Sequence, residues 1–327
     1  MSLLEVIDAC DNFPQYDPFA PGAWEKVMSQ LWRFLLPGDH RSFGFITPNT
    51  VSRMPWTTDF RIDHTSRTVR LAPVPENSTP TTSSIAKASV AAIAKQLQVA
   101  RDMNAFPKLH NWPGEQFPVL GAPFPLGIDR TFSLYFGIVI TGSQLTVFSR
   151  SDDDDRAVDG IWIAKRGANK TLYPGMLDNA VGGAVMHGES PRESLLREAL
   201  EEIGIDVKDA KPGGTVSWCS VRERNGVDLG VVMPGVQYVY DFEVDGKREL
   251  RAAESGIDWL RRLTVDEVLA ALHRREFKPS CACVMIDFFI RHGVITAEND
   301  EDFADIVARL HRRLPLPTTA PWKSTGV

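Results

Sequence analysis

Residues 182–205 read GGAVMHGESPRESLLREALEEIGI, a stretch that predicts one well-capped helix behind a pair of glycines. Ser190 precedes Pro191, and Glu193 stands three residues after the serine, which is the pattern of a capping box at a helix start. Gly204 suits the position that ends a helix in the left-handed conformation. The stretch therefore predicts a helix between Pro191 and Gly204.

Helical spacing divides this predicted helix into two faces. One stripe is apolar, and we expect it to face the core: Leu196, Ala199, Leu200 and Ile203. Glu198, Glu201 and Glu202 fall on the opposite side as spatial neighbours, where each like-charge contact costs about 0.2–0.5 kcal/mol. Such a cluster is either a solvated acidic surface or a site for a hard divalent cation such as Mg²⁺, and helix geometry alone leaves both readings open.

The composition is that of a globular protein and bounds the class of function. The chain has 327 residues, more than one hydrophobic core usually serves, so we expect two domains. A net charge of −6 argues against general binding to nucleic acid or to a membrane surface. Four cysteines without zinc-binding spacing predict buried, reduced thiols, and no targeting pattern is visible, so we expect a cytoplasmic protein.

Residues 1–127 predict an N-terminal domain of mixed α/β character. Apolar spacing predicts helices over residues 21–36 and 85–103, the second with Ser84 as its N-cap. Short strands are expected at SFGFIT, DFRID and TVRLA, the last two close enough for a hairpin. The tract 106–127 is dense in Pro and Gly, and we place the domain junction within it or just after it.

Residues 128–316 predict a second domain, followed by a tail over 317–327. Strands of a hairpin around Gly142–Ser143 are expected at LYFGIVIT and QLTVFSR, and a further strand at IWIAKRG. The run SDDDDRAVDG predicts a polar loop. More strands are expected at VSWCSVRER and GVQYVYDFEV, and helices at IDWLRRLTVDEVLAAL, CVMIDFFIRHGV and DEDFADIVARLHRRL. Strands around one special helix, followed by more helix, predict an α+β fold.

The residues around the acidic helix complete a long signature. Gly183, five residues, Glu189, seven residues and then REALEEIGI (197–205) match the Nudix box G-x5-E-x7-R-E-U-x-E-E-x-G-U, where U is aliphatic or small and apolar. The chain therefore resembles the Nudix hydrolases, which cleave nucleoside diphosphates linked to another moiety and related pyrophosphates. This resemblance implies an α/β/α sandwich and a pyrophosphatase acting on phosphoanhydride bonds.

The resemblance also implies a metal site. Glu198 and Glu202 correspond to the main ligands, and Glu201 to a further ligand that helps to orient the attacking water. The backbone carbonyl of Gly182 corresponds to another ligand. Because every ligand is an oxygen, we expect Mg²⁺ or Mn²⁺ as the cofactor.

Other residues of the box correspond to its frame. Glu189 and Arg197 correspond to the pair that braces the loop against the helix, and Arg197 is counted with the catalytic group. Gly183 and Gly204 complete this frame. Nudix enzymes often take one more acidic residue from outside the box, and Glu254 is our candidate base or ligand, although a surface glutamate in a loop is an equal alternative.

A second and longer resemblance concerns the substrate. Residues 162–190, WIAKRGANKTLYPGMLDNAVGGAVMHGES, are similar to a Nudix subgroup related to thiamine pyrophosphokinases, found in fungi and plants with an N-terminal domain of its own. EFKPSCACVMIDFFIRHGVI (276–295) and LHRRLP (310–315) match the C-terminal pattern of that subgroup. This resemblance implies removal of the terminal phosphate from oxidised forms of thiamine diphosphate, giving the monophosphate and phosphate.

Four residues near the box are candidates for binding the substrate. Lys165 and Arg166 are expected either to meet the phosphates or to form a solvated strand end. Met176 is expected to line the pocket, and Asp178 either orients a ring or hydrogen-bonds its own backbone in a turn. The expected partner is a small-molecule diphosphate, and the protein is expected to be a monomer or a homodimer.

Two other functions stay open at this stage. A nucleotide-sugar or nucleoside di- or triphosphate pyrophosphatase is the enzymatic alternative. A catalytically silent module that binds thiamine or a nucleotide is the alternative of another class, because a fold does not guarantee activity.

Overall fold

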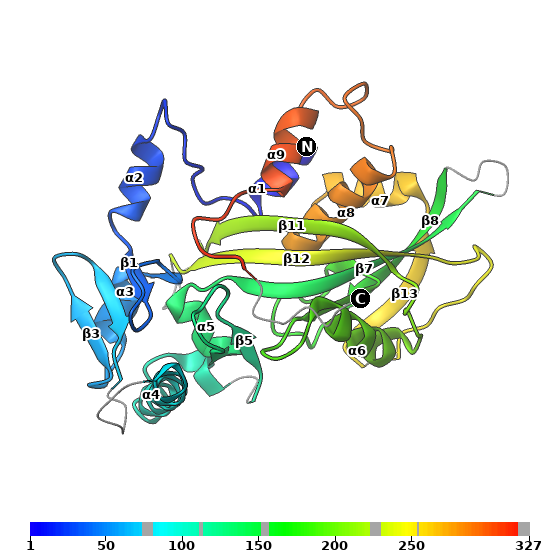
Figure 1. Cartoon of the computed structure of the whole chain (residues 1–327). Coiled ribbons are helices and arrows are strands. Elements are labelled where there is room, and N and C mark those ends of the chain that lie inside the picture. The colour runs from blue at the N-terminus through cyan, green and yellow to red at the C-terminus, as the bar shows by residue number, and fades with distance from the viewer. Residues whose placement is uncertain (74–80, 111–113, 152–156, 223–229, 254, 320–327) are drawn as a thin grey trace.

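The computed structural model describes most of the chain and mixes helices with strands (Figure 1). No helix within the described residues is both long and apolar enough to cross a bilayer. The described residues are all except 74–80, 111–113, 152–156, 223–229, 254 and 320–327.

The N-terminal region is built around a four-stranded sheet with the order β2-β1-β4-β3. Strands β3 and β4 form the hairpin that DFRID and TVRLA predicted. The strands of this sheet are β1 Trp32–Leu35, β2 Gly44–Ile46, β3 Phe60–Asp63 and β4 Thr68–Leu71. A separate two-stranded sheet follows, with β5 Gln116–Pro118 and β6 Gly127–Asp129.

Helices of this region include one long amphipathic helix, α4, which begins two residues before the capping serine that the sequence predicted. Its N-cap is Thr81, whose side chain accepts a hydrogen bond from the N–H of Ser84. The helices are α1 Leu3–Asp8, α2 Gly22–Met28, α3 Pro48–Arg53, α4 Thr82–Asp102, the short 3₁₀ helix η1 Pro107–His110 and α5 Arg130–Phe136.

The rest of the chain forms a seven-stranded mixed sheet. Its main path has the order β11-β12-β7-β8-β13, while β10 pairs with β7 and β9 pairs with β8. The strands are β7 Ile140–Arg150, β8 Val158–Arg166, β9 Leu177–Asn179, β10 Val181–Ala184, β11 Lys211–Val221, β12 Val232–Glu243 and β13 Ile257–Leu263. The helices are α6 Pro191–Ile203, α7 Val265–His273, α8 Pro279–Arg291 and α9 Phe303–Leu310.

Helices cover both faces of this sheet. Leu145 and Val147 of β7 pack with residues of α6, whereas Phe148 belongs to the core shared with α7 and α8. Because alternate residues of a strand point to opposite faces, α6 lies on one side of the sheet and α8 on the other. This arrangement is the α/β/α sandwich that the sequence predicted.

Packing crosses the predicted boundary at residue 127 in both directions. Helix α1 joins the core of α8 and α9, through residues such as Ile7. Helix α5 instead buries Phe132 and Phe136 in the core of the N-terminal sheet and α4. The division into domains at residues 127 and 316 stays a prediction.

A buried ion cluster ties the first residues to the last helix. The Asp11 carboxylate accepts hydrogen bonds from Arg309 and Arg312, each at 2.8 Å, and from the backbone N–H of Cys219 at 2.8 Å. The Asp11 side chain has no exposed surface. We call Asp11, Arg309 and Arg312 the Asp11 lock.

Two predicted helices contain strands. Residues 21–36 form α2 only as far as Met28, and Trp32–Leu35 is strand β1, paired on both sides. IDWLRRL is strand β13, which pairs with β8, and only the following residues form α7. In both cases pairing with a neighbouring strand overrides the helical spacing of a short apolar run.

The predicted hairpin around Gly142–Ser143 is wrong. Residues 140–150 run through as the single strand β7, and residues 134–136 belong to α5. A Cβ on Gly142 would overlap the carboxamide of Gln237 and approach the carbonyl oxygen of Gly183 to 2.8 Å. The glycine therefore permits close packing within the sheet and does not mark a turn.

Candidate active site

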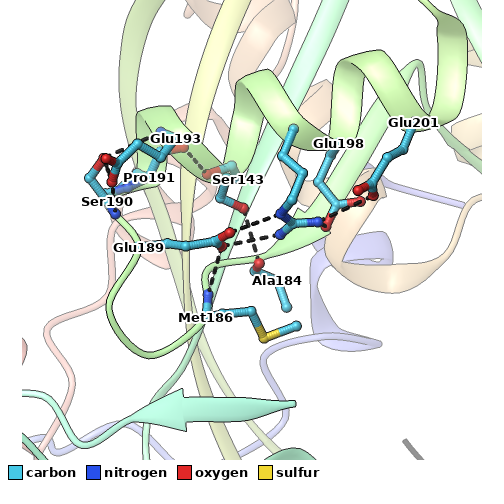
Figure 2. Close-up of polar contacts among 11 residues, drawn as sticks. Ser143, Ala184, Met186, Glu189, Ser190, Pro191, Glu193, Glu198 and Glu201 are labelled. Atoms are coloured by element: carbon cyan, nitrogen blue, oxygen red, sulfur yellow. Dashed lines mark hydrogen bonds and ion pairs between the residues drawn. The ribbon is translucent and has the colours of Figure 1, made fainter. Parts of the chain in front are cut away.

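Helix α6 begins and ends as its sequence predicts. The Ser190 side chain accepts a hydrogen bond from the N–H of Glu193, whose carboxylate accepts one from the N–H of Ser190, and Gly204 adopts a left-handed conformation with φ of 68°. The start of the helix is also tied to the sheet, because the Ser143 hydroxyl donates to the carbonyl of Pro191 at 2.7 Å (Figure 2). Local sequence and one strand contact thus fix the helix in place.

The buried stripe of α6 agrees with the predicted stripe at Ala199 and Ile203, whereas Leu196 is only partly buried. Leu195, Ala199 and Ile203 lie in the core, spaced four residues apart. Leu200, which was predicted to be in the core, is 57% exposed. A helix on a sheet buries a narrow stripe, so the i, i+4, i+8 row suffices and Leu200 faces outward.

The predicted brace forms around Arg197. Its guanidinium donates two hydrogen bonds to the carboxylate of Glu189, at 2.8 and 3.1 Å. Burial opposes ionisation of Glu189, but the bonds from Arg197 and from the N–H of Met186 outweigh it and lower the pKa of this carboxyl. Glu189 approaches from the loop, and Glu198 and Glu201 from the helix (Figure 2). One arginine therefore connects the loop to the acidic face of the helix.

The three glutamates on this face, Glu198, Glu201 and Glu202, form what we call the acid cluster. Arg197 also contacts Glu198 at 2.8 Å and Glu201 at 3.3 Å, so one guanidinium serves three carboxylates counting Glu189. The Glu198 side chain is only 15% exposed. Burial raises the pKa of Glu198 in spite of the attraction of Arg197. Arg197 thus compensates the burial of the Glu198 carboxylate only in part.

Strand β10 meets the acid cluster at its two glycines. The N–H of Gly182 donates to the Glu202 carboxylate at 2.9 Å. A Cβ on Gly183 would overlap the carboxylate of Glu198, so this glycine leaves a space that the carboxylate fills. The contacts place Gly182 and Gly183 beside Glu198 and Glu202, which the sequence predicted as metal ligands together with Glu201.

The donor set of the acid cluster fits Mg²⁺ or Mn²⁺. It consists of carboxylates and a backbone carbonyl, and hard cations prefer such oxygen ligands. Within the described residues, no three acidic, histidine or cysteine side chains already converge on one point. Arg197 holds Glu198 and Glu201, and the amide of Gly182 holds Glu202.

Two of the predicted substrate-binding residues line a cavity on the other face of the sheet. Lys165 and Met176 border a cavity of about 640 Å³ with Trp259 of β13 and residues of α7. Lys165 is paired with Leu177, which belongs to the core under α7 and α8. The cavity therefore opens on the side of the sheet away from α6.

The other two predicted substrate-binding residues pair with each other. Arg166 contacts Asp178 at 2.7 Å and also donates to the carbonyls of Leu172 and Tyr173. Burial disfavours ionisation of Asp178, but Lys278 at 3.8 Å and Arg166 lower the pKa of its carboxyl. A role of Arg166 and Asp178 in binding a substrate stays a prediction.

Sequence reasoning missed the partners that α8 supplies to Asp178. The Cys281 thiol donates to its carboxylate at 2.7 Å, and burial raises the pKa of this thiol to about 12. Lys278 precedes the first residue of α8. About 100 residues separate these partners from Asp178, and no local pattern signals such a contact.

The N-terminal region also touches the box loop, which the sequence did not reveal. The backbone N–H of His187 donates to the carbonyl of Gln116 on β5 at 2.8 Å. A Cβ on Gly127 would approach the His187 ring to 2.9 Å. The loop between β10 and α6 is therefore held from outside the sandwich. Glu254, the predicted base or ligand, lies outside the described residues.

Comparisons with known proteins agree with this geometry. The NUDIX domain model matches residues 143–281. A Saccharomyces cerevisiae protein of uncharacterised function is 31% identical over 236 residues, which cover 68% of this chain and 68% of the yeast protein. The chain belongs to the Nudix hydrolase family. It is therefore an enzyme of the class that hydrolyses phosphoanhydride bonds in small-molecule diphosphates, and Nudix hydrolases generally use divalent metal ions.

Two further Nudix relatives extend the comparison. Nudix hydrolase 20 of Arabidopsis thaliana, named as chloroplastic, is 28% identical over 68% of this chain and 58% of its own length. A solved NUDIX domain of Shewanella oneidensis NrtR, complexed with ADP ribose, aligns with 48% of this chain and 90% of its own at 13% identity, with a TM-score of 0.36. This Nudix chain thus spans little more than half of the plant enzyme.

Proposed function

We propose that this enzyme hydrolyses a diphosphate that carries a thiamine-type ring, preferably an oxidised form, to the monophosphate and phosphate. The observation that carries the hydrolytic part is the acid cluster beside the Glu189–Arg197 pair, where Arg197 contacts Glu189, Glu198 and Glu201. The thiamine part rests on the similarity of residues 162–190 to the thiamine pyrophosphokinase-related subgroup.

In this proposal, Glu198, Glu202 and the carbonyl of Gly182 would hold Mg²⁺ or Mn²⁺, with Glu201 as a further ligand. A metal bound there would supply neutralisation of charge on the phosphate oxygens and a lower pKa for the attacking water. Arg197 holds Glu189 and Glu198 in place, so it positions the loop and one metal ligand at the same time. Of the three glutamates that Arg197 contacts, Glu201 is the most exposed, at 56%, and has room to orient a water.

A preference for oxidised rings has a physical basis. Thiamine carries a permanent positive charge on its thiazolium, whereas an opened or oxidised ring loses that charge or gains a carbonyl. A neutral site gives a cation little compensation for its lost hydration, so it favours uncharged rings. A donor aimed at the new carbonyl strengthens discrimination, since sites built around a polar contact reject ligands that lack it.

The test is phosphate release from a panel of diphosphates at saturating Mg²⁺. The panel contains thiamine diphosphate, its oxo and oxy derivatives, ADP-ribose and a nucleoside triphosphate. We expect the highest kcat/KM for an oxidised thiamine derivative. If ADP-ribose or the nucleotide is preferred by tenfold or more, the thiamine proposal is wrong and an ordinary nucleotide pyrophosphatase is the better description.

The same panel addresses the remaining alternative and predictions. A silent binding module releases no phosphate from any compound, with or without metal. The oligomeric state, monomer or homodimer, and the cytoplasmic location of the enzyme stay predictions. The plant relative is named as chloroplastic.

A further inference from the structure

Four oxygen atoms on one face of the large sheet are buried without a hydrogen-bond partner. They belong to side chains of three strands, β7, β9 and β12, and each is unpaired among the described residues. These atoms are Oε1 of Gln144, Oγ1 of Thr146, Oδ1 of Asn179 and Oε1 of Gln237. We call these four residues the polar ladder.

The ladder faces α8, on the side of the sheet away from α6. Gln144, Thr146 and Phe148 alternate along β7, and the Phe148 ring packs against Phe288 of α8. The Asn179 amide donates to the sulfur of Met285 in the same helix at 3.1 Å. Four polar side chains therefore line a layer that is otherwise part of the apolar core.

Two glycines lie directly beneath the glutamines of the ladder. A Cβ on Gly182 would overlap the carboxamide of Gln144, and a Cβ on Gly142 would overlap that of Gln237. Two flexible amide side chains thus fill the space that two missing side chains leave.

Gly182 connects the ladder to the acid cluster. Its N–H binds Glu202, while its Cα faces Gln144 from the opposite side. One residue thus touches both a predicted metal ligand and the first rung of the ladder. The acid cluster and the ladder thus meet at one residue of β10, from opposite faces of the sheet.

The chemistry of the ladder selects the kind of group. Its members are two carboxamides of glutamine, one of asparagine and one hydroxyl, so it contains no charge. The Asn179 amide nitrogen already donates to Met285, which leaves its oxygen as an acceptor. The glutamine amides and the hydroxyl can each donate or accept. Buried oxygens of this kind are normally satisfied by water or by a ligand.

We propose that the polar ladder binds the uncharged, hydrogen-bonding heterocycle of the diphosphate substrate, next to Gly182. This inference rests on the proposed function and names the part of the enzyme that recognises the ring. A heterocycle with N–H donors supplies partners for Asn179 and the two glutamines. A cationic ring finds no carboxylate within the ladder, so it binds less well.

The experiment compares ring-bearing and ringless substrates in Gln144→Met, a change of similar length that removes the amide. For the oxidised thiamine diphosphate we expect kcat/KM to fall by about 10–100-fold. For methyl diphosphate, which has no ring, we expect a change below about threefold, because the acid cluster is intact. Gln98→Met, the same change on the exposed face of α4, is the matched control and leaves both values unchanged.

A second variant guards against a folding defect at the buried Gln144. Gln237→Met alters a half-buried rung and is expected to show the same selective loss. Gln144→Glu adds a carboxylate and is expected to shift the preference toward cationic thiamine diphosphate. The ladder assignment is wrong if the variants lower kcat/KM equally for both substrates, or for neither. Either result would be expected if the ladder binds only water. If the wild-type enzyme hydrolyses no ring-bearing diphosphate, the proposed function is wrong, and the ladder assignment is wrong as well.

Discussion

The Asp11 lock and the acid cluster are both built from arginine and carboxylate, but their proportions are opposite. In the lock, two arginines and a backbone amide surround the single carboxylate of Asp11. Arg197 instead serves three glutamates, of which Glu198 and Glu201 belong to the acid cluster and Glu189 comes from the loop. Burial without full compensation raises the pKa of Glu198, whereas the lock leaves no such excess of negative charge. The first arrangement is complete within the protein, whereas the second presents the oxygen donors that a divalent cation would take in the proposed function.

The largest effect on stability is expected from breaking the lock. Asp11→Asn removes the charge shared by the buried Arg312 and the partly exposed Arg309, and an uncompensated buried charge costs about 3–5 kcal/mol. Denaturant unfolding of the full chain measures this loss, and kcat of the folded fraction is expected to stay unchanged. Asp8→Asn is the matched control, since that side chain is 53% exposed and its pair with Arg309 is expected to contribute less than about 1 kcal/mol.

Breaking the acid cluster is expected to have the reverse signature. Glu201→Gln and Glu202→Gln should each lower kcat by at least about 100-fold with little change in unfolding free energy, because the removed groups act on metal and water. Glu249→Gln, a change at an exposed glutamate, is the control. Turnover close to wild type at saturating Mg²⁺ in either variant would show that its assigned role is wrong.

Metal binding should depend on the acid cluster and not on the Asp11 lock. Chelation is expected to abolish activity, and Mg²⁺ or Mn²⁺ to restore it without any need for Zn²⁺. At 100 times its Kd the metal adds about 2.7 kcal/mol to the unfolding free energy. Denaturant unfolding with and without metal should show this gain in Asp11→Asn but not in Glu198→Gln. Active protein that contains stoichiometric zinc and no magnesium would contradict the assignment.

The sequence predicts the region around α6 better than it predicts the Asp11 lock. The cap of α6 and the pair Glu189–Arg197 are encoded within a few turns of chain, so local patterns suffice. Asp11 and Arg312 meet across 301 residues, and Gln144 lies on Gly182 through strand pairing. No local spacing signals such contacts, and for the same reason strands β1 and β13 were predicted as helix.

The smallest effect is expected at the edge of the lock, from His311. Its hydrogen bond with Asp287 raises the pKa of this imidazole, which lies 3.4 Å from that carboxylate. Its contribution to stability is therefore complete below the ordinary histidine pKa near 6.5 and is lost as pH rises through the higher value in the folded state. The side chain is 48% exposed, so we expect less than about 1 kcal/mol.

Unfolding curves between about pH 5 and 8 measure this contribution. His311→Gln should reduce the difference in unfolding free energy between the two ends of that pH range. A variant that keeps the full pH dependence of the wild type would assign it to another group.

The lock also has a consequence for protein synthesis. Asp11 leaves the ribosome long before its partners, because Arg309 and Arg312 follow it by 298 and 301 residues. At a synthesis rate of about 5–20 residues per second, the apolar side of α1 stays uncovered for about 15–60 s, until the helices that pack on it have been made. During that interval Leu3, Val6 and Ile7, all buried in the finished fold, are available to chaperones. We therefore expect aggregation to threaten the nascent chain more than the mature enzyme.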